Sequence, residues 1–381
     1  MVKNKLCAII NLTEDATRLK PLTNNRPIAA LPFASRYRII DFVLSNIAHA
    51  GIDSAALFIA ESGRSIYDHI RSGDAWNLDS QVGGGIFTFS QQNWKSRHHL
   101  EQDAEDYYFN HRIYMKRSRA EYVFVTGSKI LANIDIKAVR RQHVGSQADI
   151  TLIYKPILKE MIDGNHPKER VLSFDTDGYL TQLHEVTNYP DDERINASLS
   201  MYLISVEKMN EIIDRAIADG QYMELDELIQ HYVLDYKTNT YEYTGYAANI
   251  SSIEQYYRAN MDMLDRSKFT AVFHSSLPIL TKTKNGSPTY YDKESNVKNA
   301  ILATDCLIGG EVVNSIINRK VRIAKQSKIR DSIILQGTKI GEGAEIEYAI
   351  IDKDCVIEPG AKVIGTPDNL IVIPKNTHVE A

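Results

Sequence analysis

Arg36 and Arg38 belong to a set of basic residues that could build a site for a phosphorylated ligand. A guanidinium group is permanently charged and can donate two parallel hydrogen bonds to one phosphate. We therefore predict that these two arginines contribute to a site for a phosphorylated metabolite. Other clustered basic side chains are more typical of solvated helix faces; they are Lys116, Arg117, Arg119, Arg140 and Arg141.

His98 and His99, with Glu101 and Asp103 close by, are residue types that bind metal ions. Adjacent histidines on a polar segment, without a helical or strand spacing to aim them, seldom converge on one ion. We therefore expect no metal site at this segment.

The composition excludes several classes of protein. A chain of 381 residues that is 43% hydrophobic can bury a large core, and its length suggests two domains. The net charge of −5 provides no electrostatic footprint for a nucleic acid or an anionic membrane. Three widely separated cysteines indicate a reducing compartment, and no apolar run is long enough to span a bilayer. We expect a cytoplasmic protein whose partners are small molecules or other proteins.

The first part of the chain has the pattern of an α/β domain, which we place at residues 1–280. Short apolar runs alternate there with amphipathic segments, as in βα units around a mainly parallel sheet. A polar segment with an Asn-Gly pair, residues 281–295, is the expected linker. The strands are expected at residues 7–11, 55–60, 122–126, 150–154 and 200–205, and two of the helices at residues 37–50 and 206–218.

Residues 296–381 follow a different period. Aliphatic residues recur every six positions, and triplets of them are offset by 17 residues, so that the chain returns to the same face after two sixes and a five. This pattern predicts a hexapeptide-repeat, left-handed parallel β-helix, and strand alternation in an antiparallel sandwich would not maintain such an offset. The triplets are Ile317, Ile323 and Ile329, then Ile334, Ile340 and Ile346, then Ile351, Ile357 and Val363.

An α/β domain followed by a hexapeptide β-helix is similar to the sugar-nucleotide pyrophosphorylases. Several strings resemble bacterial ADP-glucose pyrophosphorylase, which is glucose-1-phosphate adenylyltransferase, and they keep that family's order along the whole chain. The resemblance implies a Rossmann-like, GT-A-like nucleotidyltransferase domain before the β-helix. The matching strings are RLKPLTN at 18–24, YRIIDFVLSN at 37–46, SGDAWNLD at 72–79 and ANMD at 259–262.

The family's reaction joins ATP and glucose 1-phosphate into ADP-glucose and pyrophosphate, which requires that phosphate charge be neutralised. The resemblance implies a glycine-rich loop that holds the phosphates and two aspartates that hold Mg²⁺. The matching loop, Asn11 to Thr17, contains no glycine, and its Glu14 and Asp15 would repel a triphosphate. Arg18 is retained beside it and could still contact a phosphate.

Four further positions that match functional residues of the family are changed. Ser128 and Asn249 stand where the resemblance implies the metal-binding aspartates, and uncharged side chains bind Mg²⁺ poorly without a carboxylate beside them. Val186 and Ile28 stand where it implies phosphate-binding lysines, and Glu185 remains next to Val186. We therefore expect no catalytic residue, no metal ligand and no cofactor in this chain.

These combined losses favour a regulatory, catalytically impaired subunit of glucose-1-phosphate adenylyltransferase in glycogen biosynthesis. Such a chain would activate a catalytic paralogue, which would bind Mg²⁺, within a heterotetramer, and it could also self-associate. One alternative is a weakly active enzyme in which Asp135 or Glu185 has entered the metal site. Another is a stand-alone sensor of a sugar nucleotide. An acyltransferase is disfavoured because no histidine occurs from Val297 to Pro374.

Overall fold

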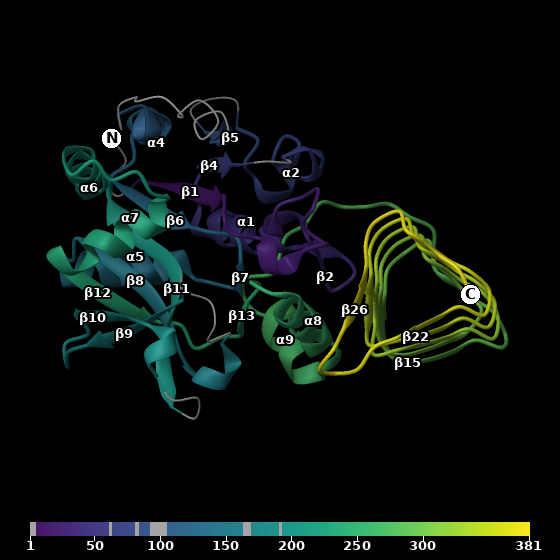
Figure 1. Cartoon of the computed structure of the whole chain (residues 1–381). Coiled ribbons are helices and arrows are strands. Elements are labelled where there is room, and N and C mark those ends of the chain that lie inside the picture. The colour runs from purple at the N-terminus through teal and green to yellow at the C-terminus, as the bar shows by residue number, and fades with distance from the viewer. Residues whose placement is uncertain (1–4, 61–62, 81–83, 92–104, 163–168, 190–192) are drawn as a thin grey trace. The chain divides into compact units, whose positions relative to one another are not determined.

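The computed structural model describes residues 5–60, 63–80, 84–91, 105–162, 169–189 and 193–381 (Figure 1). The chain divides into two compact units. Unit 1 consists of Met1–Glu14 and Phe42–Asn249, and unit 2 consists of Asp15–Asp41 and Ile250–Ala381. None of the helices in the described ranges has both the length and the hydrophobicity needed to cross a bilayer.

Unit 1 is built on a mixed sheet that has nine strands within the described residues, in the order β10-β9-β11-β6-β1-β4-β5, with β8 beside β11 and β12 beside β8. Strand β1 pairs in parallel with both β4 and β6, whereas β11 runs antiparallel to β6 and β8. The predicted α/β fold is confirmed. The strands are β1 (Leu6–Leu12), β4 (Ser54–Ile59), β5 (Gly85–Ser90), β6 (Tyr122–Thr126), β8 (Ile150–Leu158), β9 (Arg170–Phe174), β10 (Leu180–Glu185), β11 (Arg194–Ser205) and β12 (Thr238–Glu242).

The helices of unit 1 bury apolar faces against this sheet. In α6 (Val206–Ala218), Met209, Ile212, Ile213 and Ala216 recur at helical spacing and are buried together with apolar residues of β1 and β6. The Ser205 side chain caps the first turn by accepting from the Lys208 backbone N–H. The other helices are α1 (Ile39–Ala50), which begins in unit 2, and α2 (Arg64–Ile70), α4 (Glu105–Ser118), α5 (Ile136–Ser146) and α7 (Leu225–Tyr232).

Two expected elements differ from those observed. The helix expected at 37–50 begins at Ile39, because Tyr37 and Arg38 form strand β3 (Tyr37–Arg38) against β2 (Pro32–Phe33). The strand expected at 200–205 is the last half of β11, whose pairing with β8 shifts between Ser198 and Tyr202. Polar residues on both sides of this irregularity hide the first half of the strand from a pattern based on apolar runs.

The coils of unit 2 confirm the predicted β-helix, and Figure 1 shows them in section as a triangle. The 17-residue offset appears as parallel pairing, with Ile323 on Ile340 and Ile340 on Ile357. All these isoleucines lie in one buried cluster. The strands are β14 (Tyr290–Tyr291), β15 (Asn296–Leu302), β16 (Leu307–Ile308), β17 (Glu311–Ile317), β18 (Arg322–Ile323), β19 (Lys328–Arg330), β20 (Ile333–Ile334), β21 (Lys339–Ile340), β22 (Glu345–Glu347), β23 (Ala349–Ile351), β24 (Val356–Ile357), β25 (Lys362–Ile364), β26 (Ile371–Ile373) and β27 (His378–Val379).

Two segments outside the repeat also pack with the coils. In α8 (Ile253–Met261), the Tyr257 hydroxyl donates to the Asp331 carbonyl at 2.7 Å. The early segment contributes Arg26, whose guanidinium pairs with the buried carboxylate of Asp352. Packing therefore joins Asp15–Asp41 and the helices α8 and α9 (Arg266–Phe273) to the coils, and β14 begins inside the segment expected to be a linker.

Two buried histidines should make unit 1 sensitive to acid. Burial lowers the pKa of His111, which stacks on Phe58, to about 3, and burial lowers the pKa of His143 to about 4. The unfolded chain takes up these protons near pH 6.5, so below that pH it binds more protons than the folded chain. The free energy of unfolding should then fall by up to about 1.4 kcal/mol per pH unit for each histidine.

Urea unfolding at pH 7 and pH 5 tests this expectation. The His111→Phe variant should keep the ring stack and lose part of the pH dependence. The His231→Gln variant, which changes an exposed histidine, should retain all of it. Equal pH dependence in both variants would contradict the assignment.

Candidate functional site

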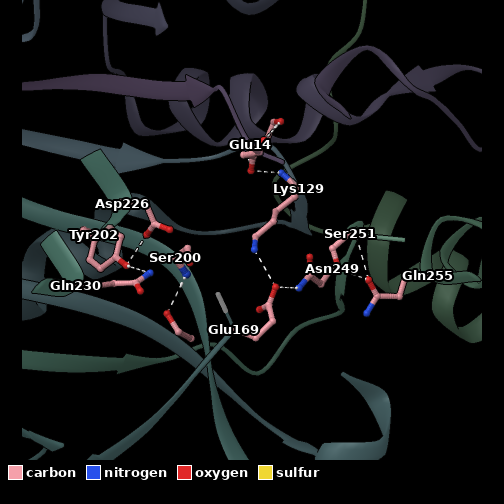
Figure 2. A network of polar contacts seen from close by, with 12 residues as sticks. Glu14, Lys129, Glu169, Ser200, Tyr202, Asp226, Gln230, Asn249, Ser251 and Gln255 are labelled. Atoms are coloured by element: carbon pink, nitrogen blue, oxygen red, sulfur yellow. Dashed lines mark hydrogen bonds and ion pairs between the residues drawn. The ribbon is translucent and has the colours of Figure 1, made fainter. Parts of the chain in front are cut away.

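The candidate site lies where β1 and β6 end. These strands are parallel, with Ile10 paired to Thr126, so the segments that follow them emerge at the same edge of the sheet. Asn11 lies near the end of β1, the segment after β1 contains Thr13 and Glu14, and the segment after β6 contains Gly127, Ser128 and Lys129. Figure 2 shows the Glu14 carboxylate next to the backbone of Lys129, whose side chain extends to Glu169.

The Glu14 carboxylate is bonded by three donors of the second segment. Its Oε1 accepts from the backbone N–H groups of Ser128 at 2.9 Å and Lys129 at 2.8 Å, and its Oε2 accepts from the Ser128 hydroxyl at 2.5 Å. Burial raises the pKa of Glu14, although these donors act in the opposite direction. A Cβ at Gly127 would collide with the Glu14 Oε1, so a larger residue at this position would displace the carboxylate from its donors. The donors that could hold a phosphate are therefore engaged by the chain itself.

A buried ion pair adjoins the Glu14 carboxylate. The Lys129 Nζ lies 2.8 Å from Oε1 of Glu169, and their side chains are only 12% and 5% exposed. Asn249 Nδ2, at the end of β13 (Ala247–Asn249), donates to the same oxygen at 2.7 Å. Burial opposes the charge on Lys129, but Glu169, assisted by Asp226 and Glu14, raises the pKa of Lys129 above its usual value.

The loop after β1 is also tied to the segment before α7. Thr13 Oγ1 donates to Glu224 Oε2 at 2.6 Å, and Asn11 Nδ2 donates to the same oxygen at 3.2 Å. Nearby, the Tyr202 hydroxyl donates to Asp226 at 2.7 Å. The loop after β1 is therefore hydrogen-bonded to Glu224 through Thr13 and to the segment after β6 through Glu14.

The residues present do not fit a Mg²⁺ ion. Ser128 and Asn249 belong to one polar network, in which each donates a hydrogen bond to an acid of the chain. The described residues contain no group of three histidine, cysteine or acidic side chains arranged for a metal. Magnesium is held by carboxylates and waters in octahedral geometry, and the Lys129 ammonium lies in the carboxylate cluster instead.

The other predicted positions of unit 1 lie elsewhere. Val186, in the 3₁₀ turn η5 (Val186–Asn188), is fully buried against Val171 and Ile195, an apolar setting. Glu185 pairs with Arg170 at 3.4 Å. Asp135 caps α5 by accepting from the Ala138 N–H at 3.1 Å. Neither acid belongs to the network of Glu14, Lys129 and Glu169.

Two further residues singled out by the sequence, Arg18 and Ile28, belong to unit 2. Arg18 lies exposed in the 3₁₀ turn η1 (Thr17–Leu19), and Ile28 is buried in η2 (Ile28–Ala30). The His98 and His99 segment, with Glu101 and Asp103, lies outside the described residues.

A basic pocket of about 560 Å³ in unit 2 contains Arg36. Lys282, Lys284 and Arg319 line it as well, with the rings of Tyr37 and Tyr291. Arg38 does not line this pocket, but its charge acts on it: burial, then Arg38 and Arg319, lower the pKa of Lys284 to about 8. Burial, then Arg38 and Arg26, likewise lower the pKa of Lys353 to about 7. Positive charge is thus concentrated around the two arginines that the sequence singled out.

Comparison with known proteins agrees with this architecture. Residues 15–166 match the nucleotidyl transferase model, and residues 287–369 match the model of the GlmU-like C-terminal hexapeptide. The chain is 30% identical to the glycogen biosynthesis protein GlgD of Bacillus subtilis over 380 residues, which cover 98% of this chain and 97% of the relative. The chain belongs to the GlgD family.

A second GlgD, from Geobacillus stearothermophilus, is 34% identical over 85% of this chain and 82% of its own length. A glucose-1-phosphate adenylyltransferase of an Anaeromyxobacter species is 27% identical over 99% of both chains. Full-length similarity thus extends from GlgD proteins to proteins named for the enzymatic reaction.

Introducing an acid at position 128 should lower the stability of unit 1. A Ser128→Asp side chain would face the Glu14 carboxylate, so the free energy of unfolding should fall by about 2 kcal/mol, against about 1 kcal/mol for Ser128→Ala, which only loses a hydrogen bond. Urea unfolding measures both. In the Glu14→Gln background, Ser128→Asp should cost clearly less, because an amide can donate to the new acid; an equal cost would show that the two carboxylates do not interact.

Proposed function

We propose that this chain is a regulatory, catalytically impaired subunit of glucose-1-phosphate adenylyltransferase in glycogen biosynthesis. It activates a catalytic paralogue that makes ADP-glucose from ATP and glucose 1-phosphate. One observation carries the proposal: Ser128 and Asn249, where the enzyme family has its metal ligands, are bonded to Glu14 and Glu169 of the same chain. The GlgD relatives support the glycogen role, and the adenylyltransferase relatives support the reaction of the partner.

The chemistry of nucleotidyl transfer explains why this arrangement is unsuited to turnover. The attack of a sugar phosphate on the α-phosphorus of ATP brings anionic groups together, and a divalent metal normally offsets that charge. Here the loop contributes Glu14, the position of one phosphate-binding lysine is the buried Val186, and the metal positions are uncharged. The Mg²⁺ and the transition-state contacts are therefore supplied by the catalytic partner.

The regulatory effect requires only a modest coupling between subunits. A subunit that binds the active conformation of its partner more tightly shifts the equilibrium by that difference, typically about 1–3 kcal/mol. We assign the association to a heterotetramer with the paralogue, with self-association as a second form. No nucleic acid or membrane takes part.

An assay of ADP-glucose formation tests the assignment directly. ATP, glucose 1-phosphate and Mg²⁺ are supplied to this chain alone, to the catalytic paralogue alone, and to their mixture. We expect no ADP-glucose formation by this chain alone, and a higher rate in the mixture than with the paralogue alone. Turnover by the isolated chain comparable with that of the paralogue would contradict the proposal and favour a rearranged active site. An unchanged oligomer and unchanged rate in the mixture would favour a stand-alone sensor.

The basic pocket of unit 2 is assigned to a phosphorylated effector, because Arg36, Lys282, Lys284 and Arg319 converge on it. Lys284→Gln should weaken binding of a sugar bisphosphate by about tenfold, the loss expected for one charge-assisted contact. Isothermal titration measures this loss, with the exposed Lys116→Gln on α4 as the control. Because the pKa of Lys284 is about 8, wild-type affinity should also fall between pH 7 and pH 9. Unchanged affinity in Lys284→Gln would place the effector elsewhere.

A further inference from the structure

The Lys129 ammonium, which follows β6, pairs with one carboxylate and lies near two others from separate segments of unit 1. Lys129 leaves the end of β6 and reaches Glu169, which precedes β9, and Asn249 of β13 donates to the same Glu169 oxygen (Figure 2). Glu14 and Asp226 add negative charge near the ammonium. One buried cation thus offsets part of the negative charge contributed by separate segments of unit 1.

We propose that Lys129 is a built-in replacement for a divalent cation, which fixes this edge of the sheet in one conformation without metal or nucleotide. This proposal rests on the proposed function in one respect only, namely that this site performs no turnover.

The Glu14 carboxylate resembles the anionic part of a metal–nucleotide complex in the donors that it binds. Two consecutive backbone N–H groups and a hydroxyl converge on the Glu14 carboxylate at 2.5–2.9 Å. Such donor sets bind phosphate oxygens in nucleotide-binding loops. In this comparison, the Glu14 carboxylate corresponds to a phosphate of the nucleotide, and the Lys129 ammonium corresponds to the divalent cation.

The two halves of this arrangement depend on each other. A buried ammonium without acids, or buried acids without a cation, carries uncompensated charge at low dielectric, and removing one partner is more damaging than removing both. Loss of Lys129 would leave the Glu169–Asn249 contact without its cation, with the negative charge of Glu14 and Asp226 nearby. No three acids of the described residues are arranged as metal ligands, but a divalent ion can be held by one or two carboxylates completed by neutral oxygens and waters.

Thermal unfolding of the full chain tests the replacement. It is recorded in EDTA, in millimolar Mg²⁺ and in millimolar Mn²⁺. The wild-type melting temperature should not respond to either ion. The Lys129→Ala variant should melt lower by about 5 °C or more in EDTA, and should regain at least half of that loss in Mn²⁺ by mass action.

Two variants serve as controls. Lys159→Ala removes another buried lysine, whose ammonium donates to the backbone carbonyl of Tyr189, and its loss of stability should not respond to metal. The double variant Lys129→Met with Glu169→Gln removes both charges and should melt higher than Lys129→Ala in EDTA.

Each outcome decides the matter. A Mn²⁺ shift in the wild type as large as in Lys129→Ala, or a destabilised Lys129→Ala variant that ignores both ions, would overturn the replacement. A Lys129→Ala chain that is soluble only when expressed with Mn²⁺ would support it, and one that is insoluble with and without Mn²⁺ would overturn it. Activation of the paralogue is measured separately with the wild-type chain, so failure of the regulatory role leaves this test intact.

Discussion

The parallel pairing of β1 with β6 is the constraint on which the site depends. It places the ends of two strands, more than 100 residues apart in sequence, at one edge of a sheet. A carboxylate from one segment then meets the backbone donors of the other. Because the Lys129–Glu169 pair also lies at this edge, a cation of the protein offsets part of the negative charge there. The same placement that brings catalytic groups together in an enzyme here brings together groups that bind one another.

In unit 2, basic residues from distant parts of the sequence are brought together by the stacking of the coils. The coils set residues of equivalent register one above another, and the early segment Asp15–Asp41 packs with them. Arg36 therefore shares a pocket with Lys284 and Arg319, residues that lie hundreds of positions later. Burial, and then the charge of neighbouring cations such as Arg38, lowers the pKa values of Lys284 and Lys353. This concentration of basic side chains supports the proposed assignment of the pocket to a phosphorylated effector.

The sequence was most informative where structure follows a local period. The 17-residue offset of the isoleucines predicted the β-helix and its register, and short apolar runs predicted β1, β4 and β6. Polar interruptions concealed the first half of β11. At the site, family strings pointed to Ser128 and Asn249, but Lys129 and Glu169 were missed because no periodicity links residues 40 positions apart that belong to different elements. Glu14 was interpreted as repelling phosphate, and its role as an internal hydrogen-bond acceptor required the three-dimensional arrangement.

The contacts of Glu14 also bear on how such a chain can evolve. The carboxylate fills the space that any side chain at position 127 would need, and it engages the hydroxyl and both N–H groups that follow. A lineage that drifted back towards catalysis would have to exchange the loop glutamate, the residue at 128 and the internal lysine in concert, since each intermediate leaves a charge unbalanced. The catalytic impairment that we propose would therefore be protected against reversal by single substitutions.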